Sequence, residues 1–122
     1  MTWKKKKLGD SGENIAVNYL EKNNYKILCR NYRCKFGEID IIAKHKGTLC
    51  FVEVKTRTSE AYGSPQEAVR TKKQKKISRV ALEFIQRYKL EDKDARFDVL
   101  AISFSFDGYK VGFIKNAFEL AV

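Results

Sequence analysis

Apolar residues return with a helical period in two separate stretches of the chain. The first stretch follows Asp10-Ser11-Gly12-Glu13, where an acid three residues after an N-cap residue has the spacing of a capping box. The apolar side chains that then share one helix face are Ile15, Ala16, Tyr19 and Leu20. This pattern predicts a helix from Asp10 to about Asn23-Asn24.

The second helical stretch begins at Ser64-Pro65-Gln66-Glu67. Ser is a favoured N-cap residue, Pro suits the first helical position, and Glu at the third position completes the start signal. The pattern predicts a helix from Pro65 to about Tyr88. Its expected inward face consists of Val69, Ile77, Val80, Ala81, Phe84, Ile85 and Tyr88.

Runs of branched and aromatic residues between turn signals predict five strands, over residues 25–30, 38–44, 48–57, 96–103 and 109–114. His45-Lys46-Gly47 and Asp107-Gly108 read as tight turns, and residues 58–64 as a loop. The order of elements is α-β-β-β-α-β-β. A single α/β domain with a central mixed sheet flanked by helices fits this order best.

Length and composition narrow the class of protein. The chain has 122 residues, of which 43% are hydrophobic, which suits one packed domain and argues against disorder. No apolar run is long enough to cross a bilayer, and none follows the basic N-terminus as a secretory signal would require. Three cysteines, none in a CxxC spacing, and one histidine argue against a disulfide framework and a zinc site. These features predict a cytoplasmic protein.

The positive charge is concentrated in two places. The chain carries 25 Lys and Arg against 15 Asp and Glu, a formal net charge of +10. Lys4, Lys5, Lys6 and Lys7 form a basic N-terminal arm over residues 1–9, ahead of a domain over residues 10–122. All of the remaining excess falls in residues 65–90, and the rest of the chain sums to zero. Such clustering is typical of a protein that binds a polyanion, although a solvated helix face is the simpler alternative.

Two carboxylates lie within apolar strand sequences. Asp40 is surrounded by branched residues in 38–44, and Glu53 by apolar residues in 48–57. Strands this apolar are typically covered on both faces, where an ionised carboxylate needs a partner. The short turn makes the two strands hairpin neighbours, so Asp40 and Glu53 can converge, with Lys55 on the same face as Glu53. A Mg²⁺ or Mn²⁺ site would relieve their repulsion. The alternative is a cross-strand salt bridge to Lys55.

An ordered series of motifs resembles a known family. Glu38-Ile39-Asp40 followed by Phe51-Val52-Glu53-Val54-Lys55-Thr56-Arg57 is similar to the core of the PD-(D/E)xK nuclease superfamily. With Gly12-Glu13, Gly63-Ser64-Pro65-Gln66-Glu67 and Arg96-Phe97-Asp98-Val99, the chain resembles the bacterial YraN family of predicted endonucleases, which is grouped with archaeal Holliday-junction resolvases. The resemblance covers residues 12 to about 102 and implies a restriction-endonuclease-like core.

The resemblance also implies roles. Asp40 and Glu53 would hold Mg²⁺ or Mn²⁺, with the Val54 carbonyl as a third protein ligand. Lys55 would orient or help to deprotonate the attacking water. Glu13 would correspond to the helical acid that joins this site in resolvase-like relatives, and its alternative role is the capping box. Glu38 would support the site without binding the metal.

The basic residues are candidate DNA contacts. Lys73 and Gln74 lie at the inward side of the second helix, where either could reach the site, although Lys73 could also simply extend along the helix surface. Tyr62, in the loop, is placed to stack on distorted DNA. The other candidate phosphate contacts are Arg57, Arg70, Lys72, Lys76 and Arg79, together with the lysines of the arm.

Two functions follow from this sequence. The first is a Mg²⁺-dependent endonuclease that hydrolyses DNA phosphodiester bonds, on branched or damaged DNA during repair or recombination. The alternative is a nucleic-acid-binding module that cleaves little, and an RNA-directed nuclease is a weaker third option. The likeness to resolvases implies a homodimer, because two nicks across a junction need two sites.

Overall fold

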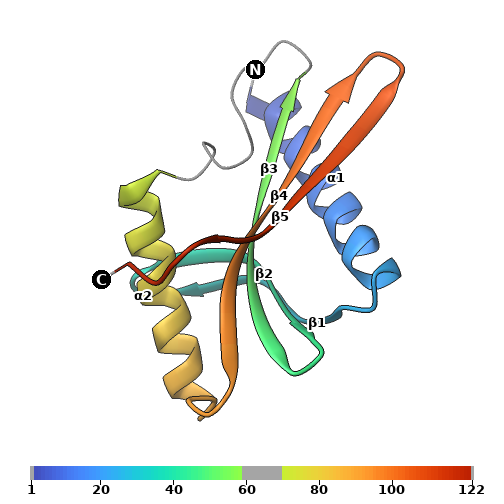
Figure 1. The fold of residues 1–122 in the computed structure, drawn as a ribbon. Coiled ribbons are helices and arrows are strands. Elements are labelled where there is room, and N and C mark those ends of the chain that lie inside the picture. Colours follow the sequence, from blue (N-terminus) through green and yellow to red (C-terminus); the bar gives the residue numbers. More distant parts are fainter. Residues whose placement is uncertain (1, 59–69, 122) are drawn as a thin grey trace.

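A five-stranded mixed sheet forms the centre of the protein in a computed structural model, which describes the backbone of residues 2–58 and 70–121 and side chains from Ser11 onward (Figure 1). The strands are β1 (Lys26–Cys34), β2 (Gly37–His45), β3 (Thr48–Thr58), β4 (Asp94–Ser105) and β5 (Gly108–Phe118). They lie in the order β1-β2-β3-β4-β5, and only the β3–β4 pair is parallel. The predicted α/β class and the α-β-β-β-α-β-β order are confirmed.

One helix covers each face of the sheet. Helix α1 (Thr2–Lys22) packs Ala16 and Leu20 on one side, against Ile41 and Val52 among others. Helix α2 (Thr71–Arg87) packs on the other side through Ile77, Val80, Ala81 and Phe84, which meet Phe51 and Ile42 of the sheet. The two layers lie on opposite sides in Figure 1. Strands β2 and β3 are therefore buried on both faces, as their apolar sequences predict.

Helix α1 begins earlier than predicted. It starts at Thr2, and the backbone remains helical through Asp10 and Glu13. The capping-box prediction is therefore wrong, because these residues lie inside the helix. Lys and Leu have high helix propensity, so the basic segment before Asp10 continues the helix. The backbone does not change at residue 9, where the arm was expected to end.

Helix α2 begins later than predicted. Its N-cap is Arg70, whose extended backbone (φ −81°, ψ 163°) interrupts any continuous helix from Pro65. The predicted start signal at residues 64–67 and the loop residue Tyr62 lie outside the described residues. At the other end, Tyr88 is 53% exposed, so the inward face of α2 ends at Ile85.

The C-terminal segment crosses from one core to the other. Phe113 packs on the α1 side of the sheet, whereas Phe118 stacks on Phe97 on the α2 side. The pairing of β5 with β4 shifts between Phe97 and Val99, and Asn116 in this irregularity has a positive φ of 55°. Phe113 and Phe118 thus belong to the core of the same chain, whereas Leu120 is 50% exposed.

The cysteines and the histidine lie in packed surroundings. Cys50 is a buried free thiol, and Cys29 and Cys34 are partly buried free thiols. His45, in the predicted tight turn, stacks on Tyr25 with ring centroids 4.0 Å apart. In the part of the chain that the structure describes, no helix combines the length and apolar character needed to cross a membrane.

Gly12 of α1 packs closely against Thr56 of β3. A Cβ at this position would lie 2.0 Å from Cγ2 of Thr56, and 3.7 Å from Cδ1 of Ile102. Thr is stiff at χ1, so it does not readily make room. The sheet therefore demands a glycine at a helical position where alanine would have the better intrinsic propensity.

We predict that Gly12→Ala destabilises the protein by about 1–2 kcal/mol, because overpacking outweighs the gain in helix propensity. Urea denaturation measures the change. Thr56→Ser removes the clashing methyl group, so the double variant Gly12→Ala/Thr56→Ser should recover most of the loss relative to Thr56→Ser alone. Equal losses in both backgrounds would contradict the proposed contact.

Candidate functional site

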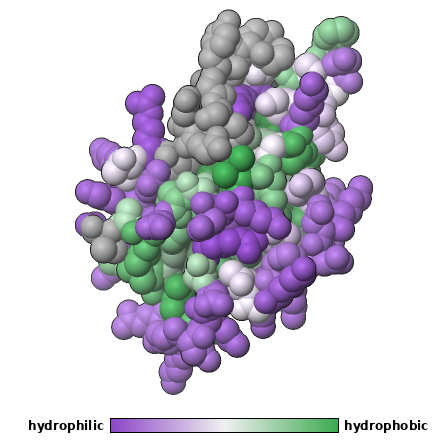
Figure 2. All heavy atoms as spheres, in the orientation of Figure 1, coloured by the Kyte–Doolittle hydropathy of each residue, from purple (hydrophilic) through white to green (hydrophobic). Residues whose placement is uncertain are grey.

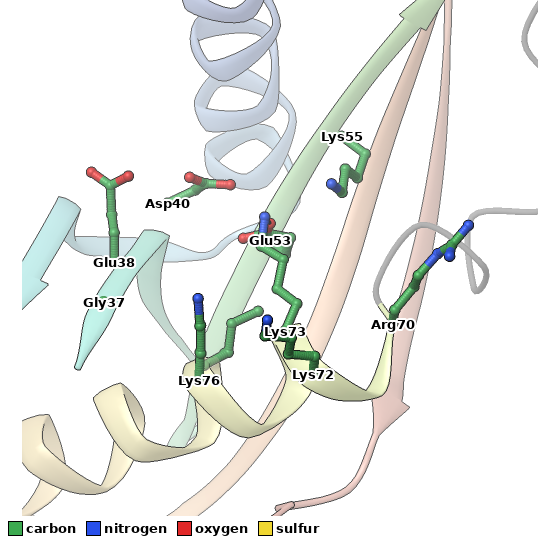
Figure 3. Close-up of a pocket in the computed structure, with 10 residues that line it drawn as sticks. Gly37, Glu38, Asp40, Glu53, Lys55, Arg70, Lys72, Lys73 and Lys76 are labelled. Atoms are coloured by element: carbon green, nitrogen blue, oxygen red, sulfur yellow. Dashed lines mark ion pairs between the residues drawn. The ribbon is translucent and has the colours of Figure 1, made fainter.

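An open pocket of about 600 Å³ lies between the sheet and the first turns of α2 (Figure 3). It combines acidic groups from β2 and β3 with basic groups from β3 and α2. Its lining residues are Gly37, Glu38, Asp40, Glu53, Lys55, Arg70, Lys72, Lys73, Lys76 and Ile77. The structure therefore brings Asp40, Glu53 and Lys55 together, as the sequence predicts, and adds four of the candidate DNA contacts.

The Asp40 carboxylate replaces a backbone carbonyl as a hydrogen-bond acceptor at the end of the β2–β3 pairing. The β2–β3 pairing runs from His45↔Thr48 to Ile41↔Val52 and goes no further. Just beyond this point, Oδ2 of Asp40 accepts a hydrogen bond from the Val54 N–H at 2.9 Å. The carboxylate thus satisfies a donor that a continuing β2 strand would have paired. This contact holds Asp40 beside Glu53.

Glu53 lies in the central strand, β3, and forms an ion pair with a lysine of α2. Its side chain is only 5% exposed, and its carboxylate forms an ion pair with Lys73 of α2 (Figure 3). The expected alternative, a cross-strand salt bridge to Lys55, is not the pair that forms. Lys73 therefore reaches the site, as one of its two predicted roles requires, and it ties α2 to β3.

The acidic pair has strongly perturbed protonation. Burial raises the pKa of Asp40 to about 7, and repulsion from Glu53 adds to this effect, while the Val54 N–H and Lys73 oppose it. Hydrogen bonding between the two carboxyl groups also favours the protonated form of Asp40. Two carboxylates placed this close share a proton unless a cation replaces it.

The two lysines are shifted in opposite directions. Burial lowers the pKa of Lys55, and the neighbouring Lys73 ammonium lowers it further. Burial also opposes the charge on Lys73, but its hydrogen bond and attraction to Glu53 outweigh that effect and raise its pKa. Lys73 is thus the cation that neutralises Glu53, while Lys55 is held beside it by the strand.

The donor set suits a hard divalent cation with two protein carboxylates. Asp40 and Glu53 offer oxygen ligands, the kind that Mg²⁺ and Mn²⁺ prefer. Mg²⁺ keeps several waters and commonly binds through one or two carboxylates, so a pair is sufficient. Among the described residues no group of three or more His, Cys, Asp or Glu side chains is placed to bind a metal.

Glu13 is not brought into this pocket. Its Oε1 accepts hydrogen bonds from Arg30 of β1, at 3.1 Å from Nη2, and from Nδ2 of Asn31 at 2.9 Å. These contacts tie α1 to β1, which is a role that the sequence did not suggest. Glu38 lines the pocket, but its carboxylate is bound by Arg33 at 2.7 Å.

Comparison with known proteins agrees with the motif series. A model of the uncharacterised protein family UPF0102 matches residues 12–102. The chain belongs to the UPF0102 family. This is the YraN family that the sequence motifs resemble.

Relatives named UPF0102 protein match nearly the whole chain. One from Geobacter metallireducens is 52% identical over 99% of both chains. One from Syntrophus aciditrophicus is 51% identical over 93% of this chain and 89% of its own. A third, from Caldicellulosiruptor saccharolyticus, is 48% identical over 93% of this chain and 98% of its own. The family is uncharacterised, so membership by itself assigns no activity.

The remaining basic candidates lie in different surroundings. Arg57 follows Lys55 along β3, in register with Ser103 of β4. Arg79 lies further along α2, where it lines a separate hollow with Phe36 and Glu83. Gln74, partly buried in α2, is not among the residues that line the main pocket. The side chains of Lys4, Lys5, Lys6 and Lys7 lie outside the described residues.

A second buried acid was missed by the sequence reasoning. Asp98 of β4 is fully buried, and it accepts hydrogen bonds from Nε of Arg96 at 3.0 Å and from the Asn116 N–H at 2.8 Å. Arg96 also donates to the Tyr25 hydroxyl at 2.7 Å. This network holds the irregular part of β5. Like Asp40, Asp98 lies among apolar strand residues, and that pattern could have indicated it.

We predict that Asp40→Asn increases stability in EDTA, and more so as pH rises from about 4 to 7. The unfolded chain releases the Asp40 proton near its ordinary pKa of 3.8, whereas the folded protein keeps it until about 7. The free energy of unfolding of the wild type therefore falls through this window. Asn imitates the protonated acid, so the difference should reach on the order of 2–4 kcal/mol above pH 7.

Denaturation in urea at pH 5, 6, 7 and 8 measures this difference. Asp94→Asn, at an exposed carboxylate of β4, is the control and should show no comparable trend. A difference between Asp40→Asn and wild type that stays constant with pH would rule out the shared proton.

We also predict that Lys73→Met lowers stability in EDTA by about 1–3 kcal/mol, because it leaves the buried Glu53 carboxylate without its cation. Lys72→Met and Lys76→Met remove equal charges from the same pocket without breaking that ion pair. Thermal denaturation of the three variants separates the effects. Equal destabilisation in all three would show that the Lys73–Glu53 pair adds nothing beyond general charge.

Proposed function

We propose that this UPF0102 protein is a divalent-metal-dependent endonuclease that hydrolyses phosphodiester bonds in DNA. One observation carries the proposal: Asp40, Glu53 and Lys55 converge in a pocket whose rim is formed by basic residues of α2. Acidic groups that can hold a metal, within a basic surface that can hold phosphates, suit phosphodiester hydrolysis. Branched or damaged DNA in repair or recombination is the substrate class that the family resemblance implies.

Asp40 and Glu53 would hold Mg²⁺ or Mn²⁺, with the Val54 carbonyl as a further ligand. When bound, the metal would polarise the scissile phosphate and lower the pKa of a bound water. The protein would hold both carboxylates in place for metal binding. The Val54 N–H orients Asp40, and Glu53 is buried in the sheet. Glu13 would join the set only after leaving its contacts with Arg30 and Asn31.

Lys55 would act on the phosphate and the attacking water. It projects into the pocket from the same strand face as Glu53, two residues further along. In a partly buried site its ammonium group interacts strongly with the charge that develops on the phosphate oxygens. The lowered pKa of Lys55 also makes it easier for this group to share a proton with water.

Helix α2 would hold the DNA backbone. Arg70, Lys72 and Lys76 line the pocket on the side opposite the carboxylates (Figure 3). Contacts of this kind position a duplex without reading its sequence. If about six phosphates are engaged, log affinity should fall with log salt with a slope of about −5. Two copies of the chain would be needed for paired nicks across a junction.

A second candidate is a nucleic-acid-binding module that cleaves little. Two observations favour it: Lys73 already neutralises Glu53, and the described residues bring only two acids close enough to share a cation. A metal would have to displace Lys73 from Glu53. The basic rim would bind DNA in either case.

The test is cleavage of linear, nicked and four-way DNA with Mg²⁺, Mn²⁺ or EDTA. We expect metal-dependent cutting by the wild type, and a loss of at least about 100-fold in Asp40→Asn and Lys55→Ala. Asp94→Asn is the matched control and should cut normally. Substrate binding by Asp40→Asn, measured by gel shift, should persist and weaken steeply with salt.

The outcomes separate the two candidates. If none of the substrates is cut with either metal, or if Asp40→Asn cuts as well as the wild type, the endonuclease proposal fails. Salt-sensitive DNA binding without cutting would then support the binding module.

A further inference from the structure

The hairpin that joins β4 to β5 presents an aromatic tip to solvent. The last pair of the ladder is Ser105↔Gly108, so Phe106 and Asp107 form the loop. The Phe106 side chain is fully exposed, and Tyr109 beside it is 54% exposed. Figure 1 shows this hairpin at the upper right, and apolar atoms lie at the same end of the surface in Figure 2.

The geometry of the turn does not require a phenylalanine at position 106. The hydroxyl of Ser105 donates to Oδ1 of Asp107 at 2.6 Å, and Gly108 supplies the positive φ of 140°. Asp and Gly are ordinary turn residues, whereas Phe offers the turn nothing. Phe104 and Tyr109 form a further ring contact behind the tip, with centroids 6.1 Å apart. Phe104 and Tyr109 are paired residues on the α1 side of the sheet, the face opposite to Lys55, whereas Phe106 lies in the loop at the end of both strands.

The tip is connected to the candidate active site by continuous strands. Lys55 pairs with Ala101 of β4, and two residues further on Arg57 pairs with Ser103, which itself pairs with Lys110 of β5. Residues directly opposite on neighbouring strands share a face. The face that carries Lys55 thus carries Arg57 and Lys110 toward the tip. From Ala101 to Phe106 is five residues, or about 17 Å.

The charge along this path favours a polyanion over an apolar partner. Residues 54–58 and 100–113 contain a single acid, Asp107, whose Oδ1 accepts a hydrogen bond from Ser105 within the turn. Arg57 and Lys110 lie between the pocket and the tip, on the face of the sheet that carries Lys55. A ligand that spans this path must satisfy cations along its length and an aromatic ring at its end. DNA with an unstacked base does both.

We propose that Phe106 is a stacking wedge for an unpaired or terminal base at a DNA branch, while the adjoining duplex lies along the strands toward Asp40 and Glu53. This inference rests on the proposed function and specifies its substrate as DNA with an accessible base face. The distance of about 17 Å from Ala101, which pairs with Lys55, to Phe106 corresponds to about five base pairs at 3.4 Å each. Cuts should therefore fall about five nucleotides from the branch point.

Binding is measured in EDTA, so that it does not depend on cleavage. The probes are a four-way junction and a linear duplex of the same sequence, with 2-aminopurine at the branch position. Phe106→Ala should weaken junction binding at least about fivefold and abolish the change in 2-aminopurine fluorescence, with little effect on the linear duplex. Phe106→Trp should retain both. Tyr88→Ala, at an exposed aromatic residue near the far end of α2, is the control.

Each outcome decides the proposal. The proposal is overturned if Phe106→Ala binds the junction as tightly as the wild type does. It is also overturned if the substitution weakens binding to the linear duplex and to the junction by the same factor. It is also overturned if light scattering shows that Phe106→Ala converts a dimer into a monomer, since the tip would then serve self-association. Phe106-dependent junction binding without cutting would support the wedge and refute the nuclease. Cutting five nucleotides from the branch only when an aromatic residue occupies position 106 would support both.

Discussion

The structure depends on how a half-buried carboxylate, Asp40, and a buried one, Glu53, are accommodated where β2 separates from β3. Asp40 accepts the Val54 N–H, and Glu53 is neutralised by Lys73. Without these partners, two acids at the centre of an apolar sheet would be costly to bury. The same contacts draw α2 onto the sheet and place its basic first turns over the acids. The ion pair that makes burial of Glu53 tolerable thereby also creates a pocket lined by acidic and basic side chains.

The parallel β3–β4 pair organises the rest of the molecule. Helix α2 lies between these strands in the sequence, as a crossover between parallel strands requires, and it therefore covers the face that carries Glu53 and Lys55. The register of β4 with β3 is continuous from Thr48 to Thr58. A rigid pair of strands thus connects the pocket to the β4–β5 hairpin. A site and a distant tip held on the same strands keep a constant separation, which suits a long, regular ligand.

Most strands could be predicted from local pattern, because their alternation and turn residues are local properties. The helix starts could not. The capping box at Asp10 lies inside α1, since neighbouring lysines continue the helix, and Arg70 interrupts the expected start of α2. The meeting of Asp40 with Glu53 followed from the hairpin, which is also local. The pairing of Glu13 with Arg30 and that of Asp98 with the Asn116 N–H depend on contacts between distant segments, and sequence spacing does not report such contacts.

By itself, the sequence determined the order of elements, the mixed sheet with helices, and the candidate set of Asp40, Glu53 and Lys55. Periodicity, turn chemistry and the cost of burying charge are sufficient for these inferences. The tertiary structure decided which cation meets Glu53, that Glu13 turns to β1, and that Phe106 stands in solvent at the hairpin tip. These features depend on how α1, α2 and the strands pack in space, because the partner of a charged group is chosen by distance in the fold.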